Sequence, residues 1–400
     1  MYKLILFMQK GKENNMKLIH LGDLHIGKPV NDYSMIADQK YILDQILTMA
    51  QERAVDGVLI AGDVYDKSVP SEEAVRIFDY FLCQLAEQGI PAFIISGNHD
   101  SDERLHFGSA LFESNGIYIS SKYEGTLAKQ TLTDEYGKVN IYLLPFVKAS
   151  QVRHFWQEEK IESYDQAVRI VVENTDINRK ERNILVAHQF VAGKGAEPEF
   201  GGSENAAVQN VGTVEMVGTD CFADFDYVAL GHIHSPQRVG RNTIRYSGSP
   251  LKYSLSEIDN PKSVPMITLG QKGNVDVELI PLQPLHDMRH LRGRMEQILD
   301  RKNISSPEDY IYVTLTDEYV IPDAMATIRQ YYPNTMKIDY DNSHTRAVGK
   351  IDVSQVTQEK SFPEIISDFY QMMYDCEISE EEMKLMLEVA GEAGVVDETD

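Results

Sequence analysis

Short apolar runs that each end in a polar cluster recur from Met16 to about Leu282. Helical patterns at 41–53 and 71–88 separate the early runs, which indicates an α/β core with buried strands. From Thr243 to Leu282 strand patterns dominate. A mixed sheet, or a two-sheet sandwich flanked by helices, fits this change better than a doubly wound sheet. The runs are KLIHLGD at 17–23, GVLIAGD at 57–63, PAFIISGNHD at 91–100, NILVAHQF at 183–190 and DYVALGHIH at 226–234.

The pattern changes after Pro281, and a second, smaller domain is predicted there. Residues 285–299 have the apolar spacing of an amphipathic helix, and 323–332 predict another helix. DYIYVTLTD at 309–317 and MKIDY at 336–340 predict strands. We therefore expect a main domain at 16–284 and a small α/β domain at 285–342. The polar residues 343–360 are expected to form a linker.

The tail, residues 361–400, contains two helix starts. Ser361 with Glu364, and Ser379 with Glu382, have the spacing of a capping box. Both predicted helices carry large apolar residues on an acidic background. Such faces either pack back on the main domain or dock into a partner protein, and their place after a linker favours the partner.

The first fifteen residues combine a short apolar stretch with a polar one. The stretch is shorter than the apolar region of a usual signal peptide, and no small-residue cleavage site follows it. Met16 stands directly before a strand pattern, so residues 1–15 are interpreted as an upstream extension. No apolar run approaches the roughly 18–20 residues that a membrane-spanning helix needs. We expect no membrane association and a cytoplasmic location.

Charge and cysteine content narrow the expectations further. The formal net charge is −24, so the chain by itself should bind DNA poorly, because Lys and Arg supply most DNA affinity. Bound divalent cations or a partner subunit can supply the missing positive charge.

The cysteines Cys83, Cys221 and Cys376 lie far apart, which predicts reduced, buried thiols rather than disulfides or a zinc cluster.

Metal-binding residue types follow each of the five apolar runs. Strand ends in α/β proteins meet at one crevice, and a carboxylate between two cations can bridge them. Mixed oxygen and imidazole ligands suit Mn, Fe or Zn better than Ca or Mg alone. The glycines at 22, 62, 97 and 231 are predicted to allow sharp turns there. The residues are Asp23 and His25; Asp63; Asn98, His99 and Asp100; His188; and His232 and His234.

One Asp-x-His is a weak pattern, but the series GDLH, GDVYD, GNHD, AHQF and GHIH, in this order, is specific. It resembles the calcineurin-like metallophosphoesterase superfamily. Residues 16 to about 255 are most similar to the SbcD nucleases within it, through DLHIGK at 23–28, GDVYD at 62–66 and YSGSPLKYSLSE at 246–257. The resemblance implies an α/β metallophosphoesterase sandwich, a capping domain at 285–342 and a C-terminal helical tail.

The same resemblance implies roles for individual residues. Asp23, His25 and His234 would hold one metal ion; Asn98, His188 and His232 would hold the other; and Asp63 would bridge both. His99 would be the catalytic residue, and Asp100 would orient His99 or its loop. The ions would be divalent, with Mn²⁺ preferred and Mg²⁺ or Fe as alternatives. Some members carry a histidine at the position of Asp66, so no catalytic role is carried over to it.

For function, the resemblance implies a DNA nuclease subunit: a 3′→5′ exonuclease on double strands and an endonuclease on single strands and hairpins. It would serve DNA end processing, recombination and repair, as a homodimer in a heterotetramer with an SMC-like, SbcC-type ATPase. Residues 361–400 would bind that ATPase, and helices in 71–113 are candidates for the dimer contact. Two alternatives remain: a phosphoesterase acting on cyclic nucleotides or phosphoproteins, and a noncatalytic scaffold for the ATPase.

Several further residues receive structural interpretations. His20 is predicted to be a core residue, and Trp156 a packing residue rather than a base-stacking one. The Gly-rich segment 193–204 is either a surface loop or a border of the site. The remaining histidines are predicted to be surface or structural residues: His106, His154, His286, His290 and His344.

Overall fold

The fold is described from a computed structural model, which defines residues 15–193, 216–343, 345, 362–374 and 377–392. The chain divides into two units, Met1–Asp287 and Met288–Asp400. The predicted extension at 1–15, apart from its last residue, and most of the linker and the Gly-rich segment lie outside the described residues.

The first unit contains a six-stranded sheet with the strand order β16-β15-β1-β4-β5-β6. Neighbours from β1 to β6 run parallel, whereas β15 pairs antiparallel with both β1 and β16. Helices α1 (Ile36–Glu52) and α2 (Glu72–Glu87) connect the parallel strands β1, β4 and β5. The strands are β1 Met16–Leu21, β4 Gly57–Ala61, β5 Ala92–Ile95, β6 Ile117–Ser120, β15 Ser263–Leu269 and β16 Val275–Pro281.

A second six-stranded sheet has the order β13-β14-β12-β9-β8-β7. Its inner neighbours β14, β12, β9 and β8 run parallel, and the edge strands β13 and β7 are antiparallel to their neighbours. The strands are β7 Ala128–Asp134, β8 Gly137–Leu144, β9 Arg182–Ala187, β12 Tyr227–Leu230, β13 Gln237–Val239 and β14 Arg241–Tyr246.

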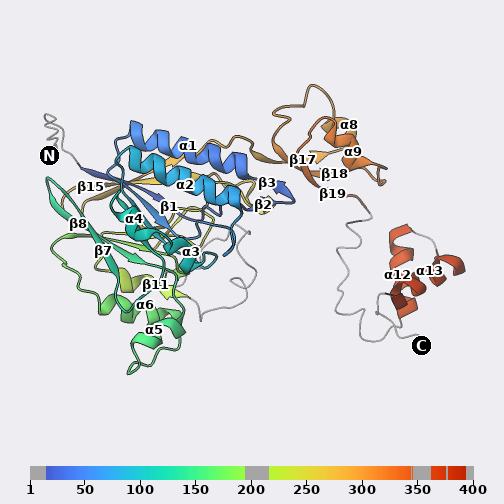
Figure 1. The fold of residues 1–400 in the computed structure, drawn as a ribbon. Helices are drawn as coiled ribbons and strands as arrows, with labels where there is room; N and C mark the ends of the chain where they lie inside the picture. Colours follow the sequence, from blue (N-terminus) through green and yellow to red (C-terminus); the bar gives the residue numbers. More distant parts are fainter. Residues whose placement is uncertain (1–14, 194–215, 344, 346–361, 375–376, 393–400) are drawn as a thin grey trace. The chain divides into compact units, whose positions relative to one another are not determined.

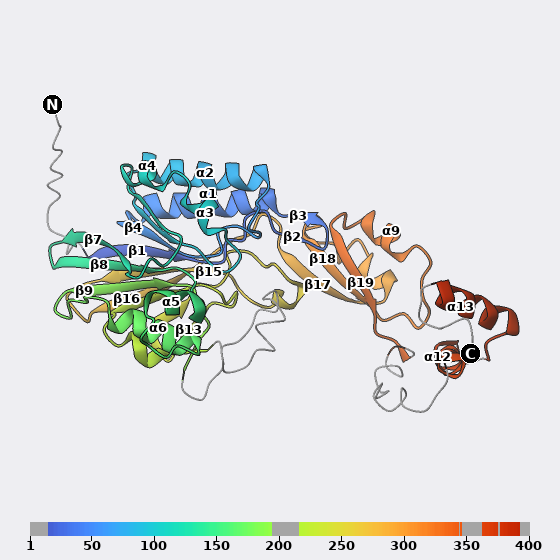
Figure 2. The same cartoon turned by 60° about the horizontal axis from the view of Figure 1, so that its bottom comes forward.

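The two sheets pack face to face, and helices cover their outer faces (Figures 1 and 2). Alternation along β9 shows how: Ile184 and Val186 join the core between the sheets, whereas Leu185 and Ala187 join the core under α5 (Ala149–Phe155) and α6 (Tyr164–Glu173). This period of two is what a strand buried on both faces requires. The predicted two-sheet sandwich flanked by helices is confirmed.

The helices predicted at 41–53 and 71–88 are confirmed as α1 and α2, although α1 begins earlier, at Ile36. Each buries an apolar stripe, for example Ile42 and Ile46 on α1 and Phe78 and Leu82 on α2. The Ser71 hydroxyl accepts a hydrogen bond from the N–H of Ala74 at the start of α2. No helix within the described ranges is both long and apolar enough to cross a bilayer.

The cysteine prediction is wrong for one residue. Cys83 is exposed because it lies on the face of α2 opposite the buried stripe that includes Leu82 and Leu85. Cys221 is partly buried, and Cys376 lies outside the described residues.

A buried ion pair ties the first residue of β9 to the edge strand β7. Arg182 is 2% exposed, and its guanidinium donates to both carboxylate oxygens of Asp134, to the carbonyl of Gly137 (2.8 Å) and to that of Gly270 (3.0 Å). Burial alone would raise the pKa of Asp134, but Arg182 and the N–H of Tyr136 hold that pKa below its usual value. The pair therefore favours the folded state whenever Asp134 is ionised.

Replacing this carboxylate, as in Asp134→Asn, should lower the free energy of unfolding by about 3–5 kcal/mol, because Arg182 keeps its charge in a buried place. Urea denaturation at pH 7 measures the loss. A depressed folded-state pKa stabilises the fold above the unfolded pKa of about 3.9, and this contribution is lost as the pH falls through the folded value. The difference between the two proteins should therefore shrink below about pH 4, and a difference that did not change with pH would contradict the charge pairing.

The second unit contains a three-stranded parallel sheet, β17-β18-β19, with short helices α8 (Met295–Ile298) and α9 (Ala324–Arg329). The strands are β17 Met288–Gly293, β18 Tyr310–Leu315 and β19 Thr335–Tyr340. The predicted strands β18 and β19 and the helix α9 are confirmed, although α9 is shorter than 323–332.

The helix predicted over 285–299 is wrong. Residues Met288–Gly293 form β17, which pairs with β18 over six positions, and only Met295–Ile298 is helical. Met288 and Leu291 are three residues apart, which places them on one face of a helix but on opposite faces of a strand. Both faces of the strand are packed, since Met288 is buried and Leu291 packs on the core that includes Val313.

The tail forms two helices that contact each other, α12 (Phe362–Tyr374) and α13 (Glu380–Glu392). The capping box at Ser379 is confirmed: its hydroxyl accepts from the N–H of Glu382 at 3.3 Å, and the Glu382 carboxylate accepts from the N–H of Ser379 at 3.1 Å. Ser361 lies outside the described residues.

Candidate metal centre

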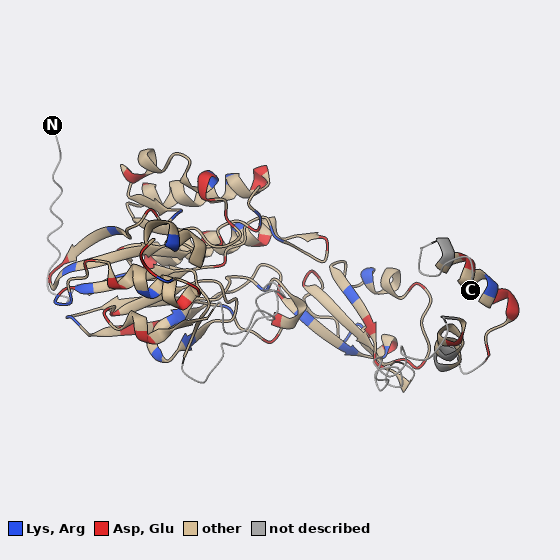
Figure 3. Ribbon diagram, turned by 90° about the horizontal axis from the view of Figure 1, so that it is seen from below, with Lys and Arg blue, Asp and Glu red and all other residues tan. Residues whose placement is uncertain are grey.

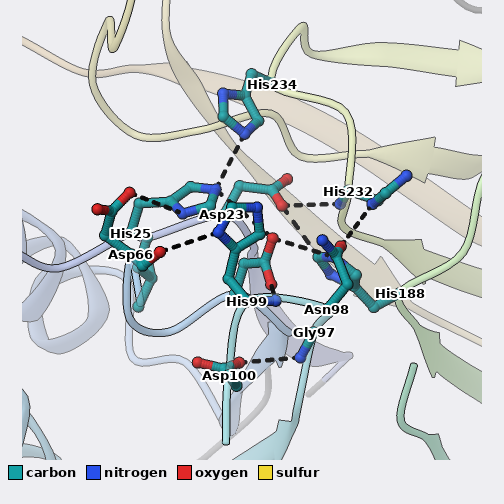
Figure 4. A network of polar contacts seen from close by, with 12 residues as sticks. Asp23, His25, Asp66, Gly97, Asn98, His99, Asp100, His188, His232 and His234 are labelled. Atoms are coloured by element: carbon teal, nitrogen blue, oxygen red, sulfur yellow. Dashed lines mark hydrogen bonds and ion pairs between the residues drawn. The ribbon is translucent and has the colours of Figure 1, made fainter. Parts of the chain in front are cut away.

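The carboxyl ends of five strands meet at one place in the first unit (Figure 4). Strands β1, β4 and β5 of the first sheet lead to Asp23, Asp63 and Asn98, and β9 and β12 of the second lead to His188 and His232. Ligand atoms of Asp23, His25 and His234 all lie within 4.8 Å of one another, as do those of Asp23, Asp63 and His188.

Asp63 lies between two groups of histidines. Its Oδ2 is 3.6 Å from Nε2 of His25 and 3.3 Å from Nε2 of His188, while its Oδ1 accepts from the N–H of His99 at 2.9 Å. One carboxylate oxygen thus faces both groups at once. The family resemblance implies that Asp63 bridges two metal ions, and this role stays a prediction.

The first group pairs two imidazoles with Asp23. Nε2 of His25 and Nε2 of His234 are 3.1 Å apart. Oδ1 of Asp23 accepts from the N–H of His232 at 2.8 Å, whereas its Oδ2 is buried without a hydrogen-bond partner among the described residues. A buried carboxylate oxygen without a donor is costly, and a cation beside it would remove that cost.

The second group surrounds the amide of Asn98. Its Oδ1 is 3.1 Å from Nε2 of His188 and 2.9 Å from Nδ1 of His232. Nδ1 of His188 is 2.7 Å from the carbonyl oxygen of Ala61, which can only accept, so Nδ1 carries the proton. In neutral His188 the Nε2 lone pair then faces the oxygens of Asp63 and Asn98. This nitrogen and the two oxygens beside it are ligand types that divalent transition-metal ions bind.

Burial and the neighbouring charges set the protonation of these groups. Burial lowers the pKa of His232 to about 3 and that of His25 well below its usual value, so both rings stay neutral, the form that binds metals. Burial raises the pKa of Asp23 to about 6 against the pull of His188 and His234. Burial also disfavours the charges of His188 and Asp63, but their attraction raises the pKa of His188 to about 9 and holds that of Asp63 well below its usual value. The carboxylates thus require positive charge beside them, from a proton or from a cation.

The backbone is strained at four of these residues. Asp23, His25, Asp63 and His232 have φ values of 51°, 42°, 48° and 100°, a region that costs side-chain-bearing residues about 1–3 kcal/mol each. Hydrogen bonds between the strand ends hold the strained loops, since the N–H of Asp23 donates to the backbone carbonyl oxygen of Gly62 at 3.1 Å and that of His25 to the backbone carbonyl oxygen of Asp63 at 2.9 Å.

The glycines at the strand ends serve two purposes, and the predicted sharp turn explains only one of them. Gly62 has a φ of 80°, as a turn requires. Glycine is needed at 97 and 231 for space: a Cβ would lie 2.1 Å from Oδ1 of Asp63 at the first position and 1.9 Å from the carbonyl oxygen of Ala61 at the second.

Gly97→Ala should therefore displace Asp63 and destabilise the fold by about 1–3 kcal/mol, a usual cost of overpacking. The measurement is thermal unfolding together with Mn²⁺-dependent hydrolysis of a phosphodiester, and both should decline. Gly193→Ala is the matched control, because its nearest atom would be 3.7 Å away. Equal behaviour of the two variants would contradict the steric explanation.

His99 and Asp100 occupy different places in the loop after β5. Nδ1 of His99 is 2.9 Å from the carbonyl oxygen of Asp66 and so donates to it, which leaves Nε2 as the ring atom able to exchange a proton with a substrate. Asp100 accepts from the N–H groups of Val64 (3.1 Å), Tyr65 (3.0 Å) and Gly97 (2.9 Å). Of the two predicted roles for Asp100, this geometry favours holding the loop.

Several residues that support the candidate ligands were not predicted from the sequence. Gln39 on α1 donates to the carbonyl oxygen of His25 at 2.8 Å, and the Tyr253 hydroxyl donates to that of Leu24 at 2.5 Å. Asp66 lies 3.9 Å from Nδ1 of His25 and 3.1 Å from Nζ of Lys28. Tyr253 lies within the motif at 246–257, but nothing local marks Gln39.

The structural interpretations of other residues hold where the chain is described. His20 is fully buried, with Nδ1 3.0 Å from the hydroxyl of Tyr227, and burial lowers its pKa to about 3. Trp156 packs on the core and donates to the hydroxyl of Tyr123 at 3.0 Å. His106, His154 and His290 are exposed and His286 is partly so, while His344 lies outside the described residues.

Comparison with known proteins agrees with this geometry. A family model described as calcineurin-like phosphoesterase matches residues 16–236, more than half of the chain. A second, described as a type 5 capsule protein repressor C-terminal domain and labelled SbcD_C, matches 284–374. The SbcD subunit of the nuclease SbcCD from Staphylococcus epidermidis is 33% identical over 374 residues, which are 91% of this chain and 95% of that protein.

Two solved structures are more distant. A protein from Thermus thermophilus has a TM-score of 0.37 and 12% identity, and covers 66% of this chain and 99% of its own. A dimetal phosphatase from Danio rerio has a TM-score of 0.39 and 12% identity, with coverages of 68% and 98%. Both scores are low, and the family assignment depends on the sequence matches instead.

The chain belongs to the calcineurin-like phosphoesterases and, within them, to the family of the SbcD subunits. It is accordingly a metal-dependent phosphodiesterase, and the donors gathered at the five strand ends fit a site for divalent metal ions.

Proposed function

We propose that the chain is a DNA nuclease subunit that hydrolyses phosphodiesters with two metal ions. Asp63 between two histidine groups is the observation that carries this proposal, because one shared carboxylate suits a pair of cations about 3.5–4 Å apart. Asp23, His25 and His234 would hold one ion, and Asn98, His188 and His232 the other. Mn²⁺ is proposed because carboxylate, amide and imidazole ligands are mixed, with Mg²⁺ or Fe as alternatives.

Two bound cations would neutralise the phosphodiester charge and activate a water molecule. The chain's own residues position the reacting groups and supply a proton. Asp63 and Asp100 fix the loop that carries His99. With both ring nitrogens protonated, His99 would give the Nε2 proton to the departing sugar oxygen while the Nδ1 proton stays on the carbonyl oxygen of Asp66. Among the charged residues drawn in Figure 3, acidic and basic positions are interspersed along the strands. With a net charge of −24, DNA binding would depend on the cations and on a partner.

We further propose the activities that the family resemblance implies: 3′→5′ exonuclease on double-stranded DNA and endonuclease on single strands and hairpins, in the cytoplasm. The test incubates the purified chain and Mn²⁺ with linear DNA, hairpin DNA and cyclic nucleotides. Cleavage of both DNAs supports the proposal. Turnover of cyclic nucleotides with intact DNA would replace it with the alternative phosphoesterase function.

The partner proposal places an SbcC-type ATPase on the tail helices. Phe369, Leu385 and Val389 are 51%, 60% and 55% exposed, a large apolar surface for a short helix pair. The relative's name, a subunit of SbcCD, supports a protein partner. Leu385→Asp with Val389→Asp should abolish copurification with the ATPase, whereas Leu279→Asp, at an exposed position of β16, should not. Unchanged copurification would move the contact elsewhere.

The dimer proposal rests on two exposed apolar residues within the predicted region 71–113. Phe107, next to α3 (Asp102–His106), and Leu111 on α4 (Ser109–Glu113) are 84% and 75% exposed. Light scattering should show a dimer that Phe107→Glu with Leu111→Glu converts to a monomer. A wild-type monomer would contradict the proposed homodimer.

A further inference from the structure

Behind His234, on the side away from the other candidate ligands, lies a buried carboxylate. Nε2 of His234 faces Nε2 of His25 at 3.1 Å, and Nδ1 on the opposite side of the ring is 3.8 Å from Oε1 of Glu257. Glu257 is fully buried at the end of the short 3₁₀ helix η3 (Leu255–Glu257). The ring therefore lies between the site and an acidic side chain.

A buried lysine completes the arrangement. Nζ of Lys262 is 2.5 Å from Oε2 of Glu257 and also donates to the carbonyl oxygen of His234 at 3.0 Å and to Oγ of Ser249 at 2.9 Å. Burying such an ion pair costs desolvation energy that apolar residues of similar size would avoid. Glu257 lies beside the ring of His234, and Lys262 donates to the backbone carbonyl oxygen of His234, so the pair has a role beyond packing.

A carboxylate also lies near the other imidazole of this group, His25. Nδ1 of His25 is 3.9 Å from Oδ1 of Asp66, which pairs with Lys28, and this nitrogen has no hydrogen-bond partner among the described residues. On the other side of Asp63, His188 uses the carbonyl oxygen of Ala61 in the same position. His188 thus donates directly to an acceptor, whereas His25 and His234 each have a carboxylate oxygen 3.9 Å and 3.8 Å from Nδ1.

We infer that Glu257 is a positioning residue for His234. Its carboxylate keeps the ring proton on Nδ1, so that the Nε2 lone pair points into the site, and Lys262 holds the carboxylate in place. Carboxylates behind ligating histidines fix the tautomer and the ring orientation in this way. The inference rests on the ligand roles proposed above, and it predicts that Glu257 affects only the ion held by His234.

The test is calorimetric titration of the purified full chain with Mn²⁺. Glu257→Gln should weaken one of two binding events about 10- to 100-fold and leave the other unchanged. Asp134→Asn is the matched control, since it also removes a buried carboxylate from an ion pair but lies outside the site; it should leave both events unchanged. Glu257→Asp, which keeps the charge but shortens the side chain, should weaken the same event by less, and it serves if the glutamine variant does not fold.

The outcomes separate this inference from the proposed function. Equal affinity of wild type and Glu257→Gln would overturn the positioning role while leaving the two-ion site intact. Equal weakening of both events would also overturn it, because a general structural role would act on the whole site. A wild-type chain that bound no Mn²⁺ would instead overturn the proposed function, and this inference with it.

Discussion

Asp63→Asn should lower phosphodiester hydrolysis on the order of 1,000-fold or more, because it removes a charge whose Oδ2 faces both His25 and His188. A loss of about 4 kcal/mol of transition-state stabilisation, within the several kcal/mol that metal ions supply, corresponds to this factor. The side chain keeps its size, and the amide oxygen can still accept from the N–H of His99. The measurement is the Mn²⁺-dependent rate on linear DNA, with Mn²⁺ affinity followed in parallel.

Asp259→Asn, at an exposed position, is the control and should retain wild-type activity. Both binding events should weaken in Asp63→Asn, in contrast to the single event expected for Glu257→Gln. An Asp63→Asn protein that kept both Mn²⁺ affinities would show that this carboxylate is not shared.

His99→Gln should reduce DNA cleavage by about 10²–10⁴-fold, the usual contribution of general acid–base catalysis, while Mn²⁺ binding stays unchanged. The reason is that His99 donates from Nδ1 to the carbonyl oxygen of Asp66 and has only Nε2 to offer a departing oxygen. The loss should appear in kcat rather than in KM.

A substrate with a good leaving group tests this role separately. Bis-p-nitrophenyl phosphate releases a nitrophenolate that needs no protonation, so its hydrolysis should fall much less in His99→Gln than DNA cleavage does. Equal losses on both substrates would assign His99 to binding or structure instead. Unchanged DNA cleavage would remove it from catalysis.

The sandwich could be predicted because its strands are buried and its helices amphipathic, so local periodicity carried the information. The segment 285–299 shows the limit of that approach. Its apolar spacing fits one face of a helix equally well, and only parallel pairing of β17 with β18, which follows β17 by a long connection, makes Met288–Gly293 a strand. A short window of sequence does not include the partner strand, so it cannot reveal this pairing.

The candidate donors could be predicted because each follows an apolar run directly, and parallel strands bring their carboxyl ends together. Residues that support the donors could not. Gln39 reaches His25 from a helix, and Lys262 reaches His234 from the start of the antiparallel strand that pairs with β1. The space requirement at Gly97 and Gly231 also comes from contacts between different strand ends, so the sequence suggested only a turn.

The most direct test of the central claim is anomalous diffraction from crystals of the chain grown with Mn²⁺. Two ions should bind, one beside Asp23, His25 and His234 and the other beside Asn98, His188 and His232, with oxygen from Asp63 ligating each. A single ion, or two ions that do not have Asp63 as a common ligand, would contradict it.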